Sequence, residues 1–438
     1  MSAMGIGGLM FLALVALLVA RLPIALAMLV AGMGGFVALA GWQPLLAHLK
    51  SAPYHRFSDY TLSVVPLFVL MGQFAAKAGL SRALFDAAKD WMGHRRGGVA
   101  MAAIGACAGF GAVCGSSLAT AATMAQVALP EMRRQGYAPA LATGALAAGG
   151  TLGILIPPSI VLVLYAVLAQ ASVGDLFIAA LVPGLIAAGG YIAAIAVSVR
   201  IDPAAAPRGE RASAAQRLAS LLATWPVLGI FLLVIGGIYG GAFTPTEAAA
   251  IGAAGTAALA LARRRLGRKE IVDAILETAV TSGMIYLILF GAEIFNGALA
   301  LSGLPAWLAA LAGDAPLAPV VLIIAIVVLY VILGCLMDSL SMVLLTVPIV
   351  LPIVTGLDFG LSPDEVVIWF GVLALMAVEV GLITPPVGMN VFVIAGIARD
   401  VPMATIFRGV LPFFISDMLR IALLIAVPGL SLWLLRVL

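Results

Sequence analysis

The stretch Ile156-Pro157-Pro158-Ser159 breaks a long apolar segment in the first half of the chain, and the segment before it carries Cys114-Gly115-Ser116-Ser117 at its centre. The same order recurs in the second half. There Met337-Asp338-Ser339-Leu340-Ser341 lies within one apolar segment, and Thr384-Pro385-Pro386-Val387-Gly388 breaks the next. Proline has no backbone N–H and kinks or ends a helix. Interrupted hydrophobic segments at corresponding places in two halves of a chain are typical of the binding regions of secondary transporters.

The composition of the chain is that of a membrane protein. Of its 438 residues, 63% are hydrophobic and 10% are charged, and the mean hydropathy is +1.19. Soluble domains are about half apolar and about a quarter charged. Apolar stretches of about 20 residues recur along the sequence, which is the length that a helix needs to cross a bilayer, and they lack the alternation of a membrane β-barrel. We therefore expect an all-α polytopic membrane protein.

Basic residues predict which loops face the cytoplasm. They cluster at 94–96, 133–134, 200–217 and 263–269, and no Lys or Arg occurs within 270–398. Cytoplasmic loops are enriched in Lys and Arg. We therefore place the four clusters inside and the loops of the interval without Lys or Arg outside.

Two segments between these loops predict re-entrant hairpins. Residues 97–130 carry no charge and have basic flanks. They are too long for one crossing, and folded in two each arm spans about 25 Å, short of a hydrocarbon core of roughly 30 Å. We predict a hairpin that enters from the cytoplasm with its tip at 114–117. For 317–357 we predict a hairpin from the opposite side, because two full crossings would leave Asp338 in a cytoplasmic turn without a basic residue.

Together these segments predict an inverted-topology repeat. The first repeat spans 1–200 and contains the broken helix 139–170, the second spans 218–438 and contains the broken helix 365–398, and the polar linker 201–217 joins them. Each repeat has three crossings, a hairpin, a broken crossing and one more crossing. The other crossings are expected near 5–20, 23–41, 61–79, 175–199, 220–242, 246–262, 280–301 and 405–434.

Two further stretches, 81–91 and 268–277, carry charged residues on one helical face and apolar residues on the other. This pattern is typical of helices that lie in the membrane interface. We expect both to be interfacial helices that lead into or out of the hairpin units, or else ordinary surface connectors.

The two tips and the two breaks form a candidate cation site. A cation in a bilayer needs oxygen ligands, and unwound backbone supplies carbonyl oxygens where protein covers it. We expect the tip at 115–117 to face the break at 151–159, and the tip at 338–341 to face the break at 381–390. The alternative is that these are only packing kinks, since Gly and Pro are common in membrane helices.

Two acidic residues lie close to these breaks. Asp338 is the only charged residue between Asp314 and Asp358. An ionisable residue at membrane depth is a functional hypothesis: Asp338 could ligate a cation, cap the second arm of its hairpin, or lie at a wet tip. Glu379 precedes Pro385 by six residues. It could hydrogen-bond to orient the unwound segment, or take a direct part in the site.

Other polar residues within crossings have simpler interpretations. Glu293 and Asn296 lie three residues apart, on one helix face. They could hold helices together or contact substrate. Asp417 and Arg420 have the same spacing in the last crossing, and we interpret them as a local structural pair. The three cysteines all lie in apolar segments without metal-ligand spacing, which predicts burial.

Four motifs carry a resemblance to a known family. They are the Gly-Ser-Ser tip at 115–117 and the runs 149–159, 241–249 and 381–388. In combination they resemble the large membrane subunit of the tripartite ATP-independent periplasmic (TRAP) transporters, and the similarity covers nearly the whole chain.

The resemblance implies an elevator-type sodium symporter in the bacterial inner membrane. Its substrates would be organic acids such as C4-dicarboxylates or sialic acids, delivered by a soluble periplasmic binding protein. A small four-helix membrane subunit would be a further partner and a separate polypeptide. Sodium ions would be the only cofactor and the lipid bilayer the surrounding medium; we expect no nucleic-acid partner.

By the same resemblance the tips and breaks hold sodium and substrate. The residues implied for sodium are Gly115, Ser116, Ser117, Thr151, Pro157, Gly334, Asp338, Ser339, Ser341, Gly381, Thr384 and Pro385. Those implied for substrate are Ser117, Pro158, Ser159, Ser341, Pro386 and Asn390. The two tips differ, because only the second contains an acid, so the resemblance does not divide the ligands between individual ions.

Three other classes of protein compete with this interpretation. A related sodium–dicarboxylate or citrate symporter would work without a binding protein. An intramembrane enzyme would need a catalytic set at depth, but the three histidines lie in predicted loops or interfaces and no His-Glu-x-x-His or Walker-type loop occurs. We therefore expect no enzymatic activity. A channel is the third alternative, but paired hairpins that enter from opposite sides fit a transporter with alternating access better.

Overall fold

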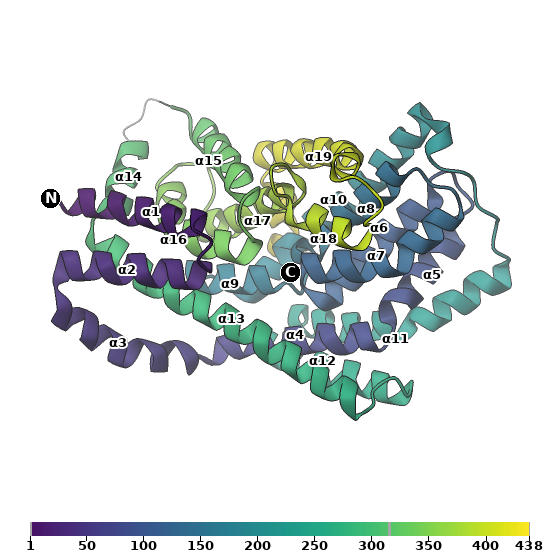
Figure 1. The fold of residues 1–438 in the computed structure, drawn as a ribbon, viewed down its shortest axis with the longest axis horizontal. Coiled ribbons are helices and arrows are strands. Elements are labelled where there is room, and N and C mark those ends of the chain that lie inside the picture. Colours follow the sequence, from purple (N-terminus) through teal and green to yellow (C-terminus); the bar gives the residue numbers. More distant parts are fainter. Residues whose placement is uncertain (1, 314–316, 438) are drawn as a thin grey trace.

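The computed structural model describes residues 2–313 and 317–437, and its regular structure is helical (Figure 1). Six of its helices are individually long and apolar enough to cross a membrane, or seven if the bent pair Pro139–Leu155 and Ile160–Ala169 counts as one span. Further apolar helices are shorter, between 10 and 17 residues. The expected all-helical architecture is confirmed.

The first half contains the first hairpin and ends with one long helix. Its helices are α1 (Ala3–Val19), α2 (Ile24–Ala40), α3 (Trp42–Phe57), η1 (Tyr60–Ser63), α4 (Val64–Lys77), α5 (Leu80–Met92), α6 (Gly98–Cys114), α7 (Ser117–Arg134), α8 (Pro139–Leu155), α9 (Ile160–Ala169) and α10 (Val173–Ile201). The hairpin consists of α6 and α7, and the long helix is α10.

The short η2 (Pro203–Ala205) lies in the linker, and the second half follows it. Its helices are α11 (Ala214–Tyr239), α12 (Pro245–Ala262), α13 (Arg268–Leu301), α14 (Leu304–Gly313), α15 (Pro319–Gly334), α16 (Ser339–Thr355), α17 (Pro363–Ile383), α18 (Met389–Ile397), α19 (Met403–Ala426) and α20 (Gly429–Val437).

In the first half, α6 and α7 pack together as a helical hairpin, and α8 and α9 are bent by 42° at the proline break. Gly115 ends α6 with φ of +65°, a left-handed conformation that glycine adopts without a steric cost. Ser116 then caps α7, because its Oγ accepts a hydrogen bond from the backbone N–H of Ala119 (3.4 Å). The tip therefore lies where the sequence predicts it.

In the second half, α15 and α16 form the corresponding hairpin, and α17 and α18 flank the second break. Asp338 caps α16 in the place that Ser116 has in the first hairpin. The peptide bonds Pro157-Pro158 and Pro385-Pro386 are both cis. The helix boundaries agree with the expected tips and breaks, whereas entry from opposite membrane faces and the inverted repeat stay predictions.

Matching glycines bring each hairpin against its broken helix. A Cβ on Gly111 of α6 would lie 2.6 Å from the Cα of Gly153 on α8, and a Cβ on Gly381 of α17 would lie 2.4 Å from the carbonyl carbon of Gly334 on α15. Real Cβ atoms do not approach other atoms so closely. Each hairpin and its broken helix therefore pack backbone to backbone through small residues, as helices in membranes commonly do.

Two expectations about element boundaries are wrong. Residues 268–277 are not a separate interfacial helix: they are the first turns of α13, which has 34 residues and no internal proline to divide it. The single crossing expected at 405–434 ends at Ala426, before Pro428, and α20 follows. Helices α3 and α14 were not expected. The stretch 81–91 does form a helix, α5, which packs against α6 and α11.

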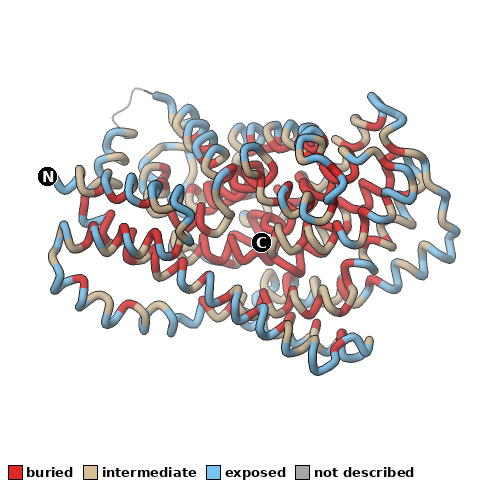
Figure 2. Tube along the Cα trace, in the orientation of Figure 1, coloured by how far each residue is buried: buried red, intermediate tan, exposed pale blue. Residues whose placement is uncertain are grey.

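Burial is concentrated in the middle of the molecule (Figure 2). Every residue of α8 from Leu141 to Leu155 is buried, and so are nearly all residues of α17 from Val366 to Ile383. Helix α15 is different, since most of its residues are exposed or half-buried. Helices α8 and α17 are thus part of the core, together with α6, most of whose residues are also buried.

Candidate functional site

Both hairpin tips line one cavity of about 620 Å³, which we call the tip cavity. The first tip contributes Gly115, Ser116 and Ser117, and the second contributes Asp338, Ser339 and Ser341. The walls come from α2, α4, α7 and α13, and their polar members are Gln73, Thr123 and Thr281. The structure therefore brings together two tips that lie more than 200 residues apart in sequence.

Other predicted site residues lie outside the lining of this cavity. They are Thr151, Pro157, Pro158, Ser159, Gly334, Gly381, Thr384, Pro385, Pro386 and Asn390. The breaks reach the cavity instead through their apolar neighbours Ile154, Ile160, Leu382 and Met389. Ser159 is fully buried and caps α9, since its Oγ accepts a hydrogen bond from the N–H of Leu162 (3.4 Å).

The first tip presents oxygen atoms next to the first break. A Cβ on Gly115 would lie 3.1 Å from the carbonyl oxygen of Pro158, so glycine allows the tip to approach that carbonyl. The hydroxyl of Thr120, one turn into α7, is buried, and among the described residues its one polar neighbour is the thiol of Cys114. It lies beside Gly153, where a Cβ would be 2.6 Å from Thr120 Oγ1 and 2.8 Å from the carbonyl oxygen of Ser116. Thr120 was not predicted from the sequence.

The second tip is organised around one carboxylate. Asp338 Oδ2 accepts hydrogen bonds from the backbone N–H groups of Leu340 and Ser341, both at 3.1 Å, and Oδ1 accepts one from the hydroxyl of Ser341. Of the three roles considered for Asp338, capping of α16 is therefore confirmed. Because the same residue lines the tip cavity, it also brings a carboxylate to the cavity.

The second break is more open than the first. Pro385 and Pro386 are exposed, whereas Pro157 and Pro158 are buried. The hydroxyl of Thr384 donates a hydrogen bond to the carbonyl oxygen of Val380 (2.5 Å), which ties the break to the last turn of α17.

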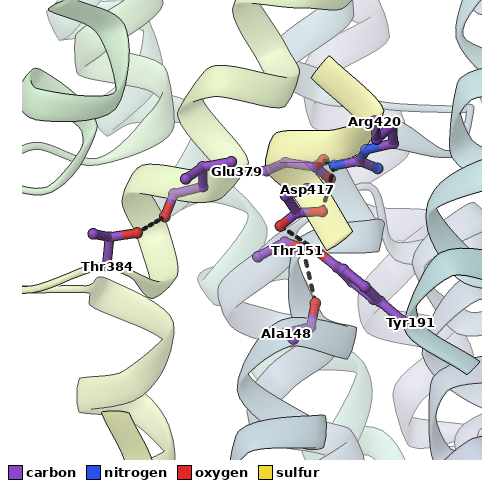
Figure 3. A network of polar contacts seen from close by, with 8 residues as sticks. Ala148, Thr151, Tyr191, Glu379, Thr384, Asp417 and Arg420 are labelled. Carbon is purple, nitrogen blue, oxygen red and sulfur yellow. Dashed lines mark hydrogen bonds and ion pairs between the residues drawn. The ribbon is translucent and has the colours of Figure 1, made fainter. Parts of the chain in front are cut away.

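A buried polar network connects the two broken helices (Figure 3). Arg420 of α19 lies 2.9 Å from both Glu379 of α17 and Asp417 of α19. The hydroxyl of Tyr191 of α10 donates to Asp417 (2.8 Å) and lies 3.1 Å from the hydroxyl of Thr151 on α8. The chain of contacts runs from α8 through α10 and α19 to α17, and Thr384 is not joined to it (Figure 3).

The members of this network occupy matching places in the two halves. Thr151 and Glu379 each precede the first proline of a break, Pro157 and Pro385, by six residues. Tyr191 and Arg420 each lie eight residues after a proline inside a helix, Pro183 in α10 and Pro412 in α19. The first half thus has a neutral pair of hydroxyls where the second half has an ion pair.

The structure gives partners to several of the acidic residues within crossings. Asp417 and Arg420 form the expected local pair. Glu379 joins them through an ion pair with Arg420, a partner that the sequence did not indicate. Glu293 holds helices together, because it lies 2.8 Å from Arg56 of α3 and does not line the tip cavity.

A second polar contact also joins the broken helices. Asn390 of α18 is fully buried, and its Nδ2 donates to the carbonyl oxygen of Ala147 on α8 (3.0 Å). Its Oδ1 has no hydrogen-bond partner in the part of the chain that the structure describes. Asn390 therefore lies at the contact between the two broken helices and not in the tip cavity.

The sequence is similar to characterised transport proteins. It is 36% identical to the C4-dicarboxylate TRAP transporter large permease protein DctM of Pseudomonas aeruginosa, over 86% of this chain and 87% of that protein. It is 33% identical to the sialic acid TRAP transporter large permease protein SiaM of Vibrio cholerae, over 85% and 86%. The ectoine/5-hydroxyectoine TRAP transporter large permease protein UehC of Ruegeria pomeroyi is 29% identical, over 97% of both.

The fold is similar to that of a solved transporter. The crystal structure of the Alcanivorax borkumensis YdaH transporter matches with a TM-score of 0.61 and covers 89% of this chain and 88% of that one, at 17% sequence identity. The family model described as "Tripartite ATP-independent periplasmic transporter, DctM component" matches residues 11–430. The chain therefore belongs to the family of the DctM component of tripartite ATP-independent periplasmic transporters, which are multi-pass membrane permeases and not enzymes.

Proposed function

We propose that this chain is the transporting subunit of a binding-protein-dependent TRAP system that carries an organic acid across the bacterial inner membrane together with sodium ions. The observation that carries the proposal is the tip cavity, where hairpins from the two halves of the chain meet. Its volume of about 620 Å³ lies in the usual range for small-molecule sites, roughly 300–1,000 Å³. The similar permeases are named for C4-dicarboxylate, sialic acid and ectoine, which all carry a carboxylate.

The oxygen atoms at the tips suit a hard monovalent cation. At the first tip the hydroxyl of Thr120 is buried with no nitrogen or oxygen partner among the described residues, and the carbonyl oxygen of Pro158 lies close to Gly115. At the second tip Asp338 supplies a carboxylate to the cavity. Among the described residues, His, Cys, Asp and Glu side chains form no group that would hold a transition metal. Sodium is therefore the cation that we assign to the tips.

Sodium gradients can supply the free energy that accumulation needs. Concentrating an acid a thousandfold costs about 4.1 kcal/mol. One net positive charge that crosses 100 mV contributes about 2.3 kcal/mol, and a tenfold sodium gradient adds roughly 1.4 kcal/mol for each ion. Two sodium ions with a monoanion move one net positive charge and supply about 5.1 kcal/mol, and three with a dianion supply about 6.5 kcal/mol, so either is sufficient without ATP.

We further propose that access alternates by an elevator movement. Each hairpin packs backbone to backbone on its broken helix. The contact joins Gly111 to Gly153 in the first half and Gly334 to Gly381 in the second. The network of Figure 3 and the Asn390 contact tie the two broken helices together. These contacts favour movement of both hairpin units as one body, while α2, α4 and α13 also line the cavity.

Uptake into proteoliposomes tests the proposal. The vesicles contain this chain and its small four-helix subunit, and a sodium gradient is imposed across their membrane. The periplasmic binding protein is added to one set and omitted from the other. We expect uptake of a carboxylate substrate only with both sodium and binding protein. Sodium-driven uptake without the binding protein would instead establish a stand-alone symporter, and uptake indifferent to sodium would remove the cation from the tips.

Substitution at the first tip tests the assignment of residues. Ser116→Ala with Ser117→Ala should raise the sodium concentration for half-maximal uptake while the amount of folded protein stays close to that of the control. The matched control is Ser362→Ala, which removes another N-cap serine at the exposed start of α17, outside the tip cavity. If both variants lose uptake only in proportion to folded protein, the tip serines have a packing role.

A further inference from the structure

A second pocket lies at the end of α10, shares no lining residue with the tip cavity, and is strongly basic. It has a volume of about 790 Å³, and its lining includes Arg95, Arg96, Arg200 and Arg208 together with His94. None of the described residues that line it is acidic. The four arginines make no ion pair and no side-chain hydrogen bond within the part of the chain that the structure describes.

The backbone holds these arginines together although they come from distant segments. The linker runs beside the loop between α5 and α6: Arg208 and Arg96 form a backbone bridge, and the N–H of Gly209 donates to the carbonyl oxygen of Gly93 (3.2 Å). A third backbone bond, from Ala138 to Ala205 (2.8 Å), fixes the start of the linker. The cluster of positive charge is therefore built into the fold and is not a chance approach of mobile side chains.

An apolar wall continues from the charged mouth of this pocket. It is formed by Gly189, Ile192, Ala193 and Ala196, which follow one face of α10 at helical spacing. From Gly189 to Arg200 the wall extends about 16 Å along the helix at 1.5 Å per residue. Because α10 is long and apolar enough to cross a membrane, the wall leads from the basic end of the span toward the hydrocarbon core.

We propose that this pocket binds an anionic phospholipid, with the phosphate on the arginines and an acyl chain along α10. Guanidinium groups pair with phosphate oxygens through two parallel hydrogen bonds. Basic pockets beside membrane helices on the cytoplasmic side suit anionic head groups. A soluble phosphate would use the arginines but not the wall, so the combination of both favours a lipid.

The bound lipid would join three parts of the chain. Arg95 and Arg96 precede the first hairpin, Arg200 ends α10, and Arg208 belongs to the linker between the two halves. Neutralising four close positive charges would remove their mutual repulsion and stabilise the packing of the linker against the loop before α6. The pocket is separate from the tip cavity, so this proposal does not depend on the sodium sites.

Thermal unfolding of the purified permease complex in detergent tests the proposal. Cardiolipin or phosphatidylglycerol is added to one set, phosphatidylcholine to a second and inorganic phosphate to a third. We expect the anionic lipids alone to raise the unfolding temperature and to remain bound in native mass spectrometry. An equal response to phosphatidylcholine, or a response to inorganic phosphate as large as that to the lipids, would overturn it.

Substitutions in the pocket test whether the lipid binds there. Arg200→Gln with Arg208→Gln should weaken binding of anionic lipid about tenfold or more, since each loses a charge-assisted hydrogen bond. The matched control is Arg264→Gln with Arg268→Gln, two exposed arginines of another basic cluster outside the pocket. Ala193→Phe keeps every charge and fills the apolar wall, so it should also weaken lipid binding. Unchanged lipid binding in both pocket variants would place the lipid elsewhere.

Discussion

The two hairpin units follow the same order in sequence but lie in different surroundings. Most of α6 is buried, because α4, α5 and α10 pack around it, and Pro157 and Pro158 are buried with it. Helix α15 packs mainly on α16 and α17, and the adjacent break exposes Pro385 and Pro386. Elements with fewer buried contacts open at lower free energy. We therefore expect the second hairpin to open more easily than the first.

The polar network shows the same asymmetry in its chemistry. At matching places the first half has Thr151 and Tyr191, which are neutral, and the second has Glu379 and Arg420, which are charged. Asp417 joins the two pairs, because it accepts a hydrogen bond from Tyr191 and one from Arg420. Removing a charge from the second pair should therefore lower the stability of the fold more than removing a hydroxyl from the first pair.

The largest expected effect is that of Arg420→Ala. Its guanidinium lies between two buried carboxylates, and its side chain is only 3% exposed. Removing one partner of a buried ion pair typically costs about 3–5 kcal/mol, because the other charge is left uncompensated. We expect a large loss of folded protein, measured by size-exclusion chromatography with fluorescence detection and by thermal unfolding.

The exposed pair of Arg436 with Glu365 supplies the control. Their side chains lie 2.7 Å apart, and that of Arg436 is 52% exposed. Exposed pairs contribute about 0–1 kcal/mol, so Arg436→Ala should leave stability almost unchanged. Equal stability of the two variants would show that the network adds no more than a surface ion pair.

The next effect concerns the close contact between the second hairpin and its broken helix. Gly381→Ala places a Cβ 2.4 Å from the backbone of Gly334, which neither helix can accommodate without a shift. Overpacking of this kind costs about 1–3 kcal/mol. Gly111→Ala makes the corresponding test in the first unit, at 2.6 Å from Gly153. If the second unit is the looser one, Gly381→Ala should be tolerated better than Gly111→Ala.

Thermal unfolding and uptake are measured for both glycine variants. Gly283→Ala is the control, because a Cβ there meets no atom within 4 Å and Ala favours a helix over Gly by about 0.8–1.0 kcal/mol. It should be neutral or stabilising. If Gly283→Ala also lowers the unfolding temperature, replacing a helical glycine would be destabilising by itself. The close contact would then not explain the effect of the other two variants.

Much of this comparison could be predicted from the sequence, but not all of it. Prolines and small polar residues act locally, so the tips and breaks lie where they were expected. Apart from the Asp417–Arg420 pair, the network was not predicted, because Tyr191 and Asp417 are brought together only by packing of α10 on α19. The difference in burial between α6 and α15 could not be predicted either, because both helices are apolar throughout. Their sequences do not show which of the two is covered by other helices.

A smaller effect is expected from Asp338→Asn at the second tip. Asn is also a good N-cap residue, so α16 should keep its start while the cavity loses its carboxylate. The half-saturating sodium concentration for uptake should rise by about tenfold, because interactions with a charged oxygen are roughly twice as strong as neutral ones. Asp358→Asn, at an exposed position outside the tip cavity, is the control. Unchanged sodium dependence would limit Asp338 to capping.

The smallest effect is expected from Tyr191→Phe, which removes one hydroxyl and leaves the ring packed against Phe413. The variant takes away the hydrogen bond to Asp417 and the contact with Thr151, and such bonds contribute about 0.5–1.5 kcal/mol. Stability should therefore fall by much less than in Arg420→Ala. If the network only stabilises the fold, uptake should follow the amount of folded protein. If it makes the two broken helices move together, the maximal rate should fall further than stability does, while the sodium dependence set at the tips stays unchanged. A loss as large as that of Arg420→Ala would show that the neutral half of the network matters as much as the charged half.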